Sequence, residues 1–183
     1  MSEPVVIVLA SGRGDRFVAS GGTGSKLQAM LAGVPVLQRT LDAVQASGLP
    51  WHLESEPHPG MGDSIAAAVR ATQEAGGWLV LPGDLPLVQP ATLRTVAAAL
   101  SQHAVVLPHF DGQRGHPVGF GAECRDALLS LAGEQGAAPV VRRYAQAGRV
   151  ARLDLDDAGL VADIDTVADL AKAEELLRAR GRS

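Results

Sequence analysis

Cysteine, aromatic residues and long apolar runs are scarce in this chain of 183 residues. Its one cysteine, Cys124, excludes an intrachain disulfide and a cysteine-rich zinc site, and we interpret it as a small buried hydrophobe. The N-terminus has no basic region ahead of its apolar run, and no apolar stretch approaches the length of a membrane span. We therefore expect a cytoplasmic protein without a membrane partner.

The scarcity of aromatic residues requires an aliphatic core. Hydrophobic residues make up 46% of the chain and aromatic residues 3%, which is typical of layered folds in which alanine-rich helices pack on a sheet. The net charge of −4 argues against nucleic acid as a partner and favours a small phosphorylated ligand in a local basic pocket. The length predicts a single domain over 1–183.

Apolar runs alternate with helical periodicity along the chain, which predicts an α/β fold with a mainly parallel sheet. Strands are expected at 5–9, 51–54, 78–81, 104–107, 118–120 and 149–155. Helices are expected over 37–47, from 63 or 64 to 75, 90–100, 127–131 and 139–146, with a last helix after the capping box of Thr166 and Asp169. Between Gly48 and Gly60 there is room for one short strand and no crossover helix, which leaves open that one strand–helix unit is missing.

The first apolar run breaks into Ala-Ser-Gly-Arg-Gly-Asp-Arg at 10–16. Gly12 and Gly14 would let backbone N–H groups approach phosphate oxygens, and Arg16 and the later Lys26 would add positive charge. Any tight strand-to-helix turn can also use glycines, so a phosphate-binding loop and a plain turn both stay open here. A P-loop kinase is disfavoured, because Lys26 lies between serine and leucine and not in the sequence Gly-Lys-Ser/Thr.

Asp84 follows the expected strand at 78–81. Ligands of open α/β sheets gather outside the carboxyl ends of the strands, so Asp84 would face the same crevice as the glycine loop. A carboxylate in that place can hold Mg²⁺ against nucleotide phosphates. The alternative is a turn aspartate that bonds its own backbone.

Six short motifs follow one another along nearly the whole chain. They are Leu9-Ala10-x-Gly12-x-Gly14-x-Arg16, Lys26-Leu27, Gly60-Met61-Gly62-Asp63-Ser64, Leu81-x-Gly83-Asp84-x-Pro86-Leu87, Gly115-His116-Pro117-Val118 and Asp163-Ile164-Asp165-Thr166. Together they resemble the molybdenum cofactor cytidylyltransferase branch of the nucleotidyltransferases. The resemblance implies a Rossmann-like three-layer fold and transfer of a nucleoside monophosphate from an NTP, with CTP expected, to a phosphorylated acceptor, with molybdopterin expected. Pyrophosphate is then released.

The resemblance also implies roles for individual residues. We expect the following assignment: Arg16, Lys26 and Asp84 as catalytic residues; Leu9, Ala10, Gly12, Gly14, Arg16, Lys26, Gly62 and Ser64 at the nucleotide; His116 and Pro117 at the acceptor; Asp84 and Asp165 at Mg²⁺. Each of the weaker candidates keeps a structural alternative: Ser64 can cap a helix, and His116 can be a turn histidine. Asp163 and Asp165 alternate along an extended segment, so only one of them is expected to face the metal, and motif position favours Asp165.

Two stretches depart from the family's pattern. A glycine-rich insertion at 17–25 separates Arg16 from Lys26, and the segment 48–60 is short. A second class of function therefore stays open, namely a non-catalytic protein that keeps a nucleotide or pterin pocket and delivers cofactor to a partner such as a molybdoenzyme.

Overall fold

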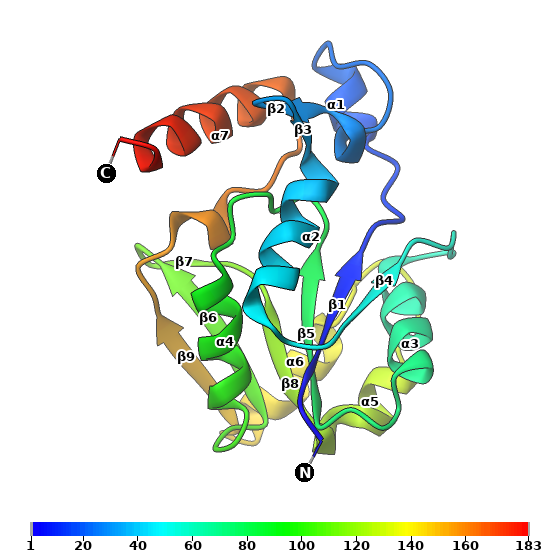
Figure 1. Ribbon diagram of the computed structural model, residues 1–183. Helices are drawn as coiled ribbons and strands as arrows, with labels where there is room; N and C mark the ends of the chain where they lie inside the picture. Colours follow the sequence, from blue (N-terminus) through cyan, green and yellow to red (C-terminus); the bar gives the residue numbers. More distant parts are fainter. Residues whose placement is uncertain (1, 183) are drawn as a thin grey trace.

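The computed structural model describes residues 2–182, and its centre is a seven-stranded sheet (Figure 1). Its strands are β1 (Val5–Leu9), β4 (Trp51–Glu54), β5 (Gly77–Pro82), β6 (Val105–Phe110), β7 (Gln113–Arg114), β8 (Val118–Gly121) and β9 (Val150–Asp154). The order is β4-β1-β5-β8-β6-β7, with β9 also paired to β6. A separate two-stranded hairpin joins β2 (Met30–Leu31) to β3 (Val34–Pro35).

Most strands of the sheet run in one direction, as expected from the alternating pattern. β1 pairs in parallel with β4 and β5, and β6 pairs in parallel with β9. β8 lies antiparallel between β5 and β6, so those two strands also share a direction. Their carboxyl ends therefore open at one edge, and the expectation of a mainly parallel sheet is confirmed.

Helices cover both faces of the sheet. On one face, α2 (Val36–Ser47) and α4 (Pro90–Ala99) pack against Val6, Val8, Leu79 and Leu81. On the other, α3 (Met61–Ala71), α5 (Arg125–Leu129) and α6 (Ala138–Gln146) pack against strand residues that include Ile7, Trp78 and Phe120. The core is aliphatic with a few large aromatic side chains, and Cys124 is fully buried in it.

A third cluster covers the carboxyl edge of the sheet. There α1 (Asp15–Ala19), the β2–β3 hairpin and α7 (Val167–Arg180) come together, and Figure 1 shows α7 across the top of the view. Phe17, Leu31 and Ile164 are buried in this cluster. Three 3₁₀ turns complete the elements: η1 (Lys26–Gln28), η2 (Ala122–Cys124) and η3 (Ala158–Val161).

Local signals set several element ends. Gly48 ends α2 in the left-handed region at φ 76°, and Pro90 opens α4. Thr166 and Asp169 form the expected capping box of α7.

The expected start and end of α3 were wrong. The helix begins at Met61 with Gly60 as its N-cap, because the Asp63 carboxylate accepts a hydrogen bond from the Gly133 N–H instead of capping the helix. It ends at Ala71, well before Gly76, and Gly77 already belongs to β5. Similarly, α5 ends at Leu129, because residues 130–131 close with turn bonds to Asp126 and Leu128.

The segment after Gly48 forms one short strand, as its length predicts. β4 pairs only with β1 in the sheet order of residues 2–182, and a loop at 55–60 leads from it directly into α3. In this same part of the chain, no helix combines the length and the apolar character that a bilayer crossing requires.

Candidate active site

A cleft of about 590 Å³ opens at the carboxyl ends of β4, β1 and β5. Its lining comes from the glycine loop, η1, the start of α3, the loop after β5 and the segment before α7. The lining residues are Leu9, Ser11, Gly12, Arg13, Gly14, Asp15, Arg16, Lys26, Leu27, His58, Pro59, Gly60, Met61, Ser64, Pro82, Gly83, Asp84, Glu134 and Asp165. Segments far apart in the sequence thus meet at the edge where α/β sheets bind ligands.

The glycine loop forms the floor of this cleft. Gly14 adopts φ 69°, a left-handed conformation that glycine reaches without strain, and it leads into α1. A Cβ added at Gly12 would meet no atom within 4 Å, so the loop backbone at that point is open to a ligand. Leu9 and the two loop glycines therefore line the cleft.

The insertion at 17–25 folds back and returns Lys26 to the glycine loop. Its anchor is Phe17, whose carbonyl accepts a hydrogen bond from the Gly22 N–H at 3.0 Å and whose ring leaves no room for a side chain at Gly22. Gly14 is a neighbour of Lys26, because a Cβ added at Gly14 would be in ordinary contact with the lysine Cγ at 3.5 Å. Lys26 therefore lies beside the glycine loop despite its longer distance along the chain from Arg16.

Lys26 is the centre of the charged network in the cleft. Its ammonium Nζ lies 2.7 Å from Asp84 Oδ2 and 3.0 Å from Asp165 Oδ1, and its side chain is 14% exposed. Burial opposes the charged form, but the Asp84 and Asp165 carboxylates outweigh it and raise the pKa of Lys26. Arg16, whose side chain is 79% exposed, reaches Asp165 Oδ2 at 3.3 Å. Both cations are therefore beside the glycine loop.

One oxygen of the Asp84 carboxylate lacks a hydrogen-bond partner. This oxygen, Oδ1, is buried, although a buried carboxylate oxygen without a partner is costly. The side chain is held in place because Gly83 lets the loop after β5 lie against β1: the Gly83 N–H donates to the Leu9 carbonyl at 2.8 Å, and an added Cβ would press on that oxygen. The free oxygen is a position for a ligand.

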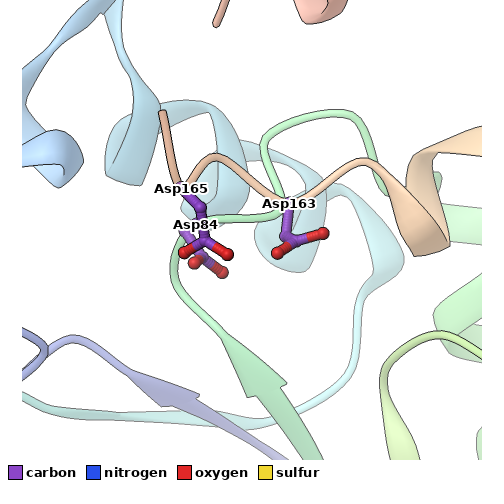
Figure 2. Close-up of side chains that lie close together, drawn as sticks. All are labelled: Asp84, Asp163 and Asp165. Carbon is purple, nitrogen blue, oxygen red and sulfur yellow. The ribbon is translucent and has the colours of Figure 1, made fainter. Parts of the chain in front are cut away.

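Asp84, Asp163 and Asp165 form a group of carboxylates (Figure 2). One oxygen from each lies within 4.8 Å of the others, a grouping of hard oxygen donors that suits a divalent cation such as Mg²⁺. Together with the unpartnered oxygen of Asp84, this donor set fits a metal ion. Only Asp165 was expected at the metal; of the two aspartates only Asp165 lines the cleft, but Asp163 also approaches Asp84 and Asp165 closely.

The reason lies in the segment between η3 and α7, which is not a strand and so does not alternate. The Ile164 N–H donates to the Asp84 carbonyl at 2.9 Å, and the Asp165 N–H donates to Asp169 Oδ2 at 3.1 Å. Because the segment is not a strand, one carboxylate oxygen of each aspartate lies within 4.8 Å of the other and of Asp84. Burial, followed by the hydrogen bond and charge of Asp165, raises the pKa of Asp163. For Asp165 burial acts in the same direction, but Lys26 outweighs it and lowers the pKa.

Two residues expected at the nucleotide, Ala10 and Gly62, do not line the cleft. The Gly62 N–H donates to the Gly133 carbonyl at 2.8 Å, and the Ala10 N–H donates to the Glu54 carbonyl at 2.9 Å, so neither amide is free for a nucleotide. Ser64, in contrast, lines the cleft, and its hydroxyl lies 3.2 Å from that of Ser11.

His116 and Pro117 lie outside the lining of the cleft. The His116 N–H donates to the Leu160 carbonyl at 2.9 Å, and Pro117 is buried. Burial, with a smaller effect from Arg114, lowers the pKa of His116 to about 4, so the ring is neutral near pH 7. The structure therefore favours the alternative of a packed turn histidine.

Sequence reasoning missed a second group at the opposite end of the cleft. Glu54, at the end of β4, is 6% exposed and lies between His52 and His58. His58 lines the cleft. The available signal was the spacing of His52 and Glu54, because residues two apart on a strand point to the same side.

A family model described as a MobA-like NTP transferase domain matches residues 43–149, more than half of the chain. Among curated relatives, a bifunctional protein GlmU from Bordetella petrii is 33% identical over 129 residues. The match covers 56% of this chain and 27% of that protein, so the chain spans about a quarter of the length of this relative.

Solved structures share the fold. A nucleotidyl transferase from Methanothermobacter thermautotroptrophicus superposes with a TM-score of 0.79 at 20% identity, covering 98% of this chain and 100% of the other. Molybdopterin-guanine dinucleotide biosynthesis protein A from Archaeoglobus fulgidus superposes with a TM-score of 0.62 at 19% identity, covering 96% and 99%. The expected α/β nucleotidyltransferase fold is confirmed.

Proposed function

This chain belongs to the MobA-like NTP transferase domain family, and from that premise we propose that it transfers a nucleoside monophosphate from an NTP to a phosphorylated small molecule. The observation that carries the proposal is the meeting of Lys26, Asp84 and Asp165 beside an open glycine loop. This arrangement offers cations and backbone donors to phosphates and carboxylates to a metal ion. Those are the groups that phosphoryl transfer needs, because its catalysis is mostly positioning and neutralisation of charge.

Asp84 and Asp165 would hold the Mg²⁺ ion, and Asp163 is a third carboxylate within reach. The support is the unpartnered Oδ1 of Asp84 within the carboxylate group. A bound Mg²⁺ would neutralise charge on the phosphate oxygens and so favour the displacement. Lys26, now paired with Asp84 and Asp165, would then be free to turn toward phosphate oxygens as the metal satisfies the carboxylates.

The glycine loop and its cations would bind the triphosphate. The backbone around Gly12 and Gly14 would donate to phosphate oxygens, while Lys26 and Arg16 would stabilise the charge that develops on the departing pyrophosphate. An acceptor phosphate oxygen forms the new bond to the α-phosphorus, and the bond from that phosphorus to the bridging oxygen of the pyrophosphate breaks. The acceptor phosphate is already ionised at neutral pH, so the step requires no general base.

We propose CTP as the nucleotide and molybdopterin as the acceptor. The order of motifs along the chain supports both substrates, and the similarity of the fold to a molybdopterin-guanine dinucleotide biosynthesis protein supports the molybdopterin acceptor alone. The proposal assigns no contact with substrate to His116 or Pro117, because neither lines the cleft.

Release of pyrophosphate tests the function directly. The purified protein would be incubated with Mg²⁺, molybdopterin and each of CTP, GTP, ATP and UTP in turn. We expect release that depends on both the NTP and the acceptor and is fastest with CTP. Tight pterin binding without pyrophosphate release from any NTP would overturn the proposal and favour the non-catalytic delivery protein.

A further inference from the structure

A buried carboxylate at the β4 end of the cleft is shared by two histidines. Glu54 Oε1 lies 3.2 Å from His58 Nε2 and accepts a hydrogen bond from the Glu56 N–H at 3.3 Å. Glu54 Oε2 lies 3.4 Å from His52 Nε2. Both oxygens of this carboxylate therefore have partners within the protein.

The charge of Glu54 determines which ring nitrogen of His58 carries hydrogen. Burial works against ionisation, but the hydrogen bonds from His58, His52 and Glu56 outweigh it and lower the pKa of Glu54, so the group is a carboxylate at neutral pH. A carboxylate only accepts hydrogen bonds. The Nε2 of His58 must therefore donate, and in the neutral ring Nδ1 is left as an acceptor.

His58 lies where the nucleoside part of an NTP would reach. Along the carboxyl edge of the sheet the order is β4, β1, β5, so the glycine loop after β1 lies between His58 and Asp84. A triphosphate bound between the glycine loop and Asp84 leaves the side toward β4 for the base. Met61, an apolar side chain that is 50% exposed, lines the same part of the cleft and offers a flat base an apolar surface.

We propose that His58, oriented by Glu54, reads the hydrogen-bonding edge of the nucleobase and selects cytosine over uracil. This inference rests on the proposed function, because it requires that an NTP occupy the cleft. The acceptor Nδ1 matches the exocyclic amine of cytosine and repels the carbonyl oxygen that uracil carries at the same position. Glu54 is the positioning residue in this scheme, because it holds the donor hydrogen on Nε2.

A metal centre at the same residues is not supported. Two histidines and a glutamate are common ligands of Zn²⁺. Within residues 2–182, however, the side chains whose ligand atoms come together for a metal are Asp84, Asp163 and Asp165, and the two histidines are not part of such a group. They flank opposite oxygens of Glu54, so the carboxylate orients the rings and does not join them around an ion.

The test compares the affinities of the full protein for CTP and UTP in the presence of Mg²⁺ by calorimetric titration. Wild-type protein is expected to bind CTP about tenfold more tightly than UTP, which is the discrimination that one matched and one repelled hydrogen bond supplies. His58→Ala is expected to bring the ratio close to one, mostly by weakening CTP. Glu54→Gln is expected to lower the ratio as well, because its amide can present a donor to His58 and reverse the tautomer.

Two controls separate base reading from general damage. His52 contacts the same carboxylate but does not line the cleft, so His52→Ala is expected to keep the CTP:UTP ratio. Tripolyphosphate with Mg²⁺ probes the phosphate side alone, and its affinity is expected to be the same in wild-type, His58→Ala and Glu54→Gln proteins.

Four results would overturn the inference in different ways. An unchanged CTP:UTP ratio in His58→Ala would remove the role of His58 and leave the proposed function intact. A wild-type preference for UTP would remove that role and the proposed choice of CTP, but not nucleotidyl transfer itself. A wild-type protein that binds no NTP at all would overturn both the role of His58 and the proposed function. A loss of tripolyphosphate affinity in His58→Ala would place His58 at the phosphates and not at the base.

Discussion

The two ends of the cleft both contain a buried carboxylate but give it different partners. At the β5 end, Asp84 holds Lys26 with one oxygen and leaves the other without a partner. At the β4 end, Glu54 has both oxygens engaged by the protein. Low solvent exposure of a carboxylate therefore does not by itself identify a ligand position. The oxygen of Asp84 without a partner led to the proposed metal position, whereas the contacts of both Glu54 oxygens led to the proposed orientation of His58.

The largest effect on activity is expected from Asp84, at the β5 end of the cleft. Asp84→Asn keeps the shape of the side chain but removes the negative charge that would hold the metal, so we expect pyrophosphate release to fall by about a thousandfold or more. Release would be measured under saturating NTP, with circular dichroism to show that the fold persists. Asp126→Asn is the matched control, because this carboxylate is 94% exposed and far less constrained. Turnover near the wild-type rate in folded Asp84→Asn protein would falsify the assignment.

A smaller effect distinguishes the two cations. Position in the motif favours Arg16 as the stronger phosphate ligand, whereas the contacts lead us to expect the opposite order, because Lys26 is 14% exposed between two carboxylates and Arg16 is 79% exposed. We expect Lys26→Met to weaken binding of Mg²⁺ and NTP by about tenfold to a hundredfold, and Arg16→Met by only about twofold to fivefold. Calorimetric titration ranks them. A larger loss in the Arg16 variant would show that exposure does not decide the contribution.

At the β4 end of the cleft, the hydrogen bonds of Glu54 predict that the stability of the protein depends on pH. The pKa of Glu54 in the folded protein is below its ordinary value of 4.5, so its ionic contribution is fully present above that value and is lost as the pH falls through the folded pKa. The difference in melting temperature between wild-type protein and Glu54→Gln is therefore expected to be greatest above about pH 4.5 and to narrow below it. Thermal unfolding of both proteins between pH 3 and 7 measures it. A constant difference across this range would contradict the assigned partners.

The smallest effect on binding is expected outside the cleft. His116 is partly buried and lies outside the lining of the cleft, so His116→Ala should leave the affinity for NTP within about twofold while lowering the free energy of unfolding by about 1 kcal/mol. Titration with NTP and thermal unfolding give the two quantities. A clear loss of NTP affinity with unchanged stability would show that His116 reaches the nucleotide.

Much of the fold could be predicted from local patterns. The apolar runs at β1 and β5, the periodicity of α2 and the capping box of α7 all act within a few residues, so they are visible in the chain itself. The start of α3 could not be predicted, because Asp63 bonds the backbone of Gly133, which is 70 residues away.

The candidate site divides in the same way. Asp84, Gly12 and Gly14 were expected at the end of a strand, and the structure places them along the cleft. The approach of Asp163 to Asp84 and Asp165 was not expected, because strict alternation of side chains holds only in a strand and this segment is not one. Glu54 was missed because a carboxylate on an edge strand is ordinarily exposed, and only its contacts with His52 and His58 make it noteworthy.

By itself, the sequence determined the alternation of strands and helices, the glycine loop and the aspartate at the end of β5, because these depend on neighbouring residues along the chain. Only the tertiary structure decided that Lys26 contacts Asp165, which is 139 residues away, and that the insertion between Arg16 and Lys26 closes back on the loop. The physical reason is that the packing of elements far apart in the sequence determines which charged groups come into contact. A local sequence pattern contains no information about that packing.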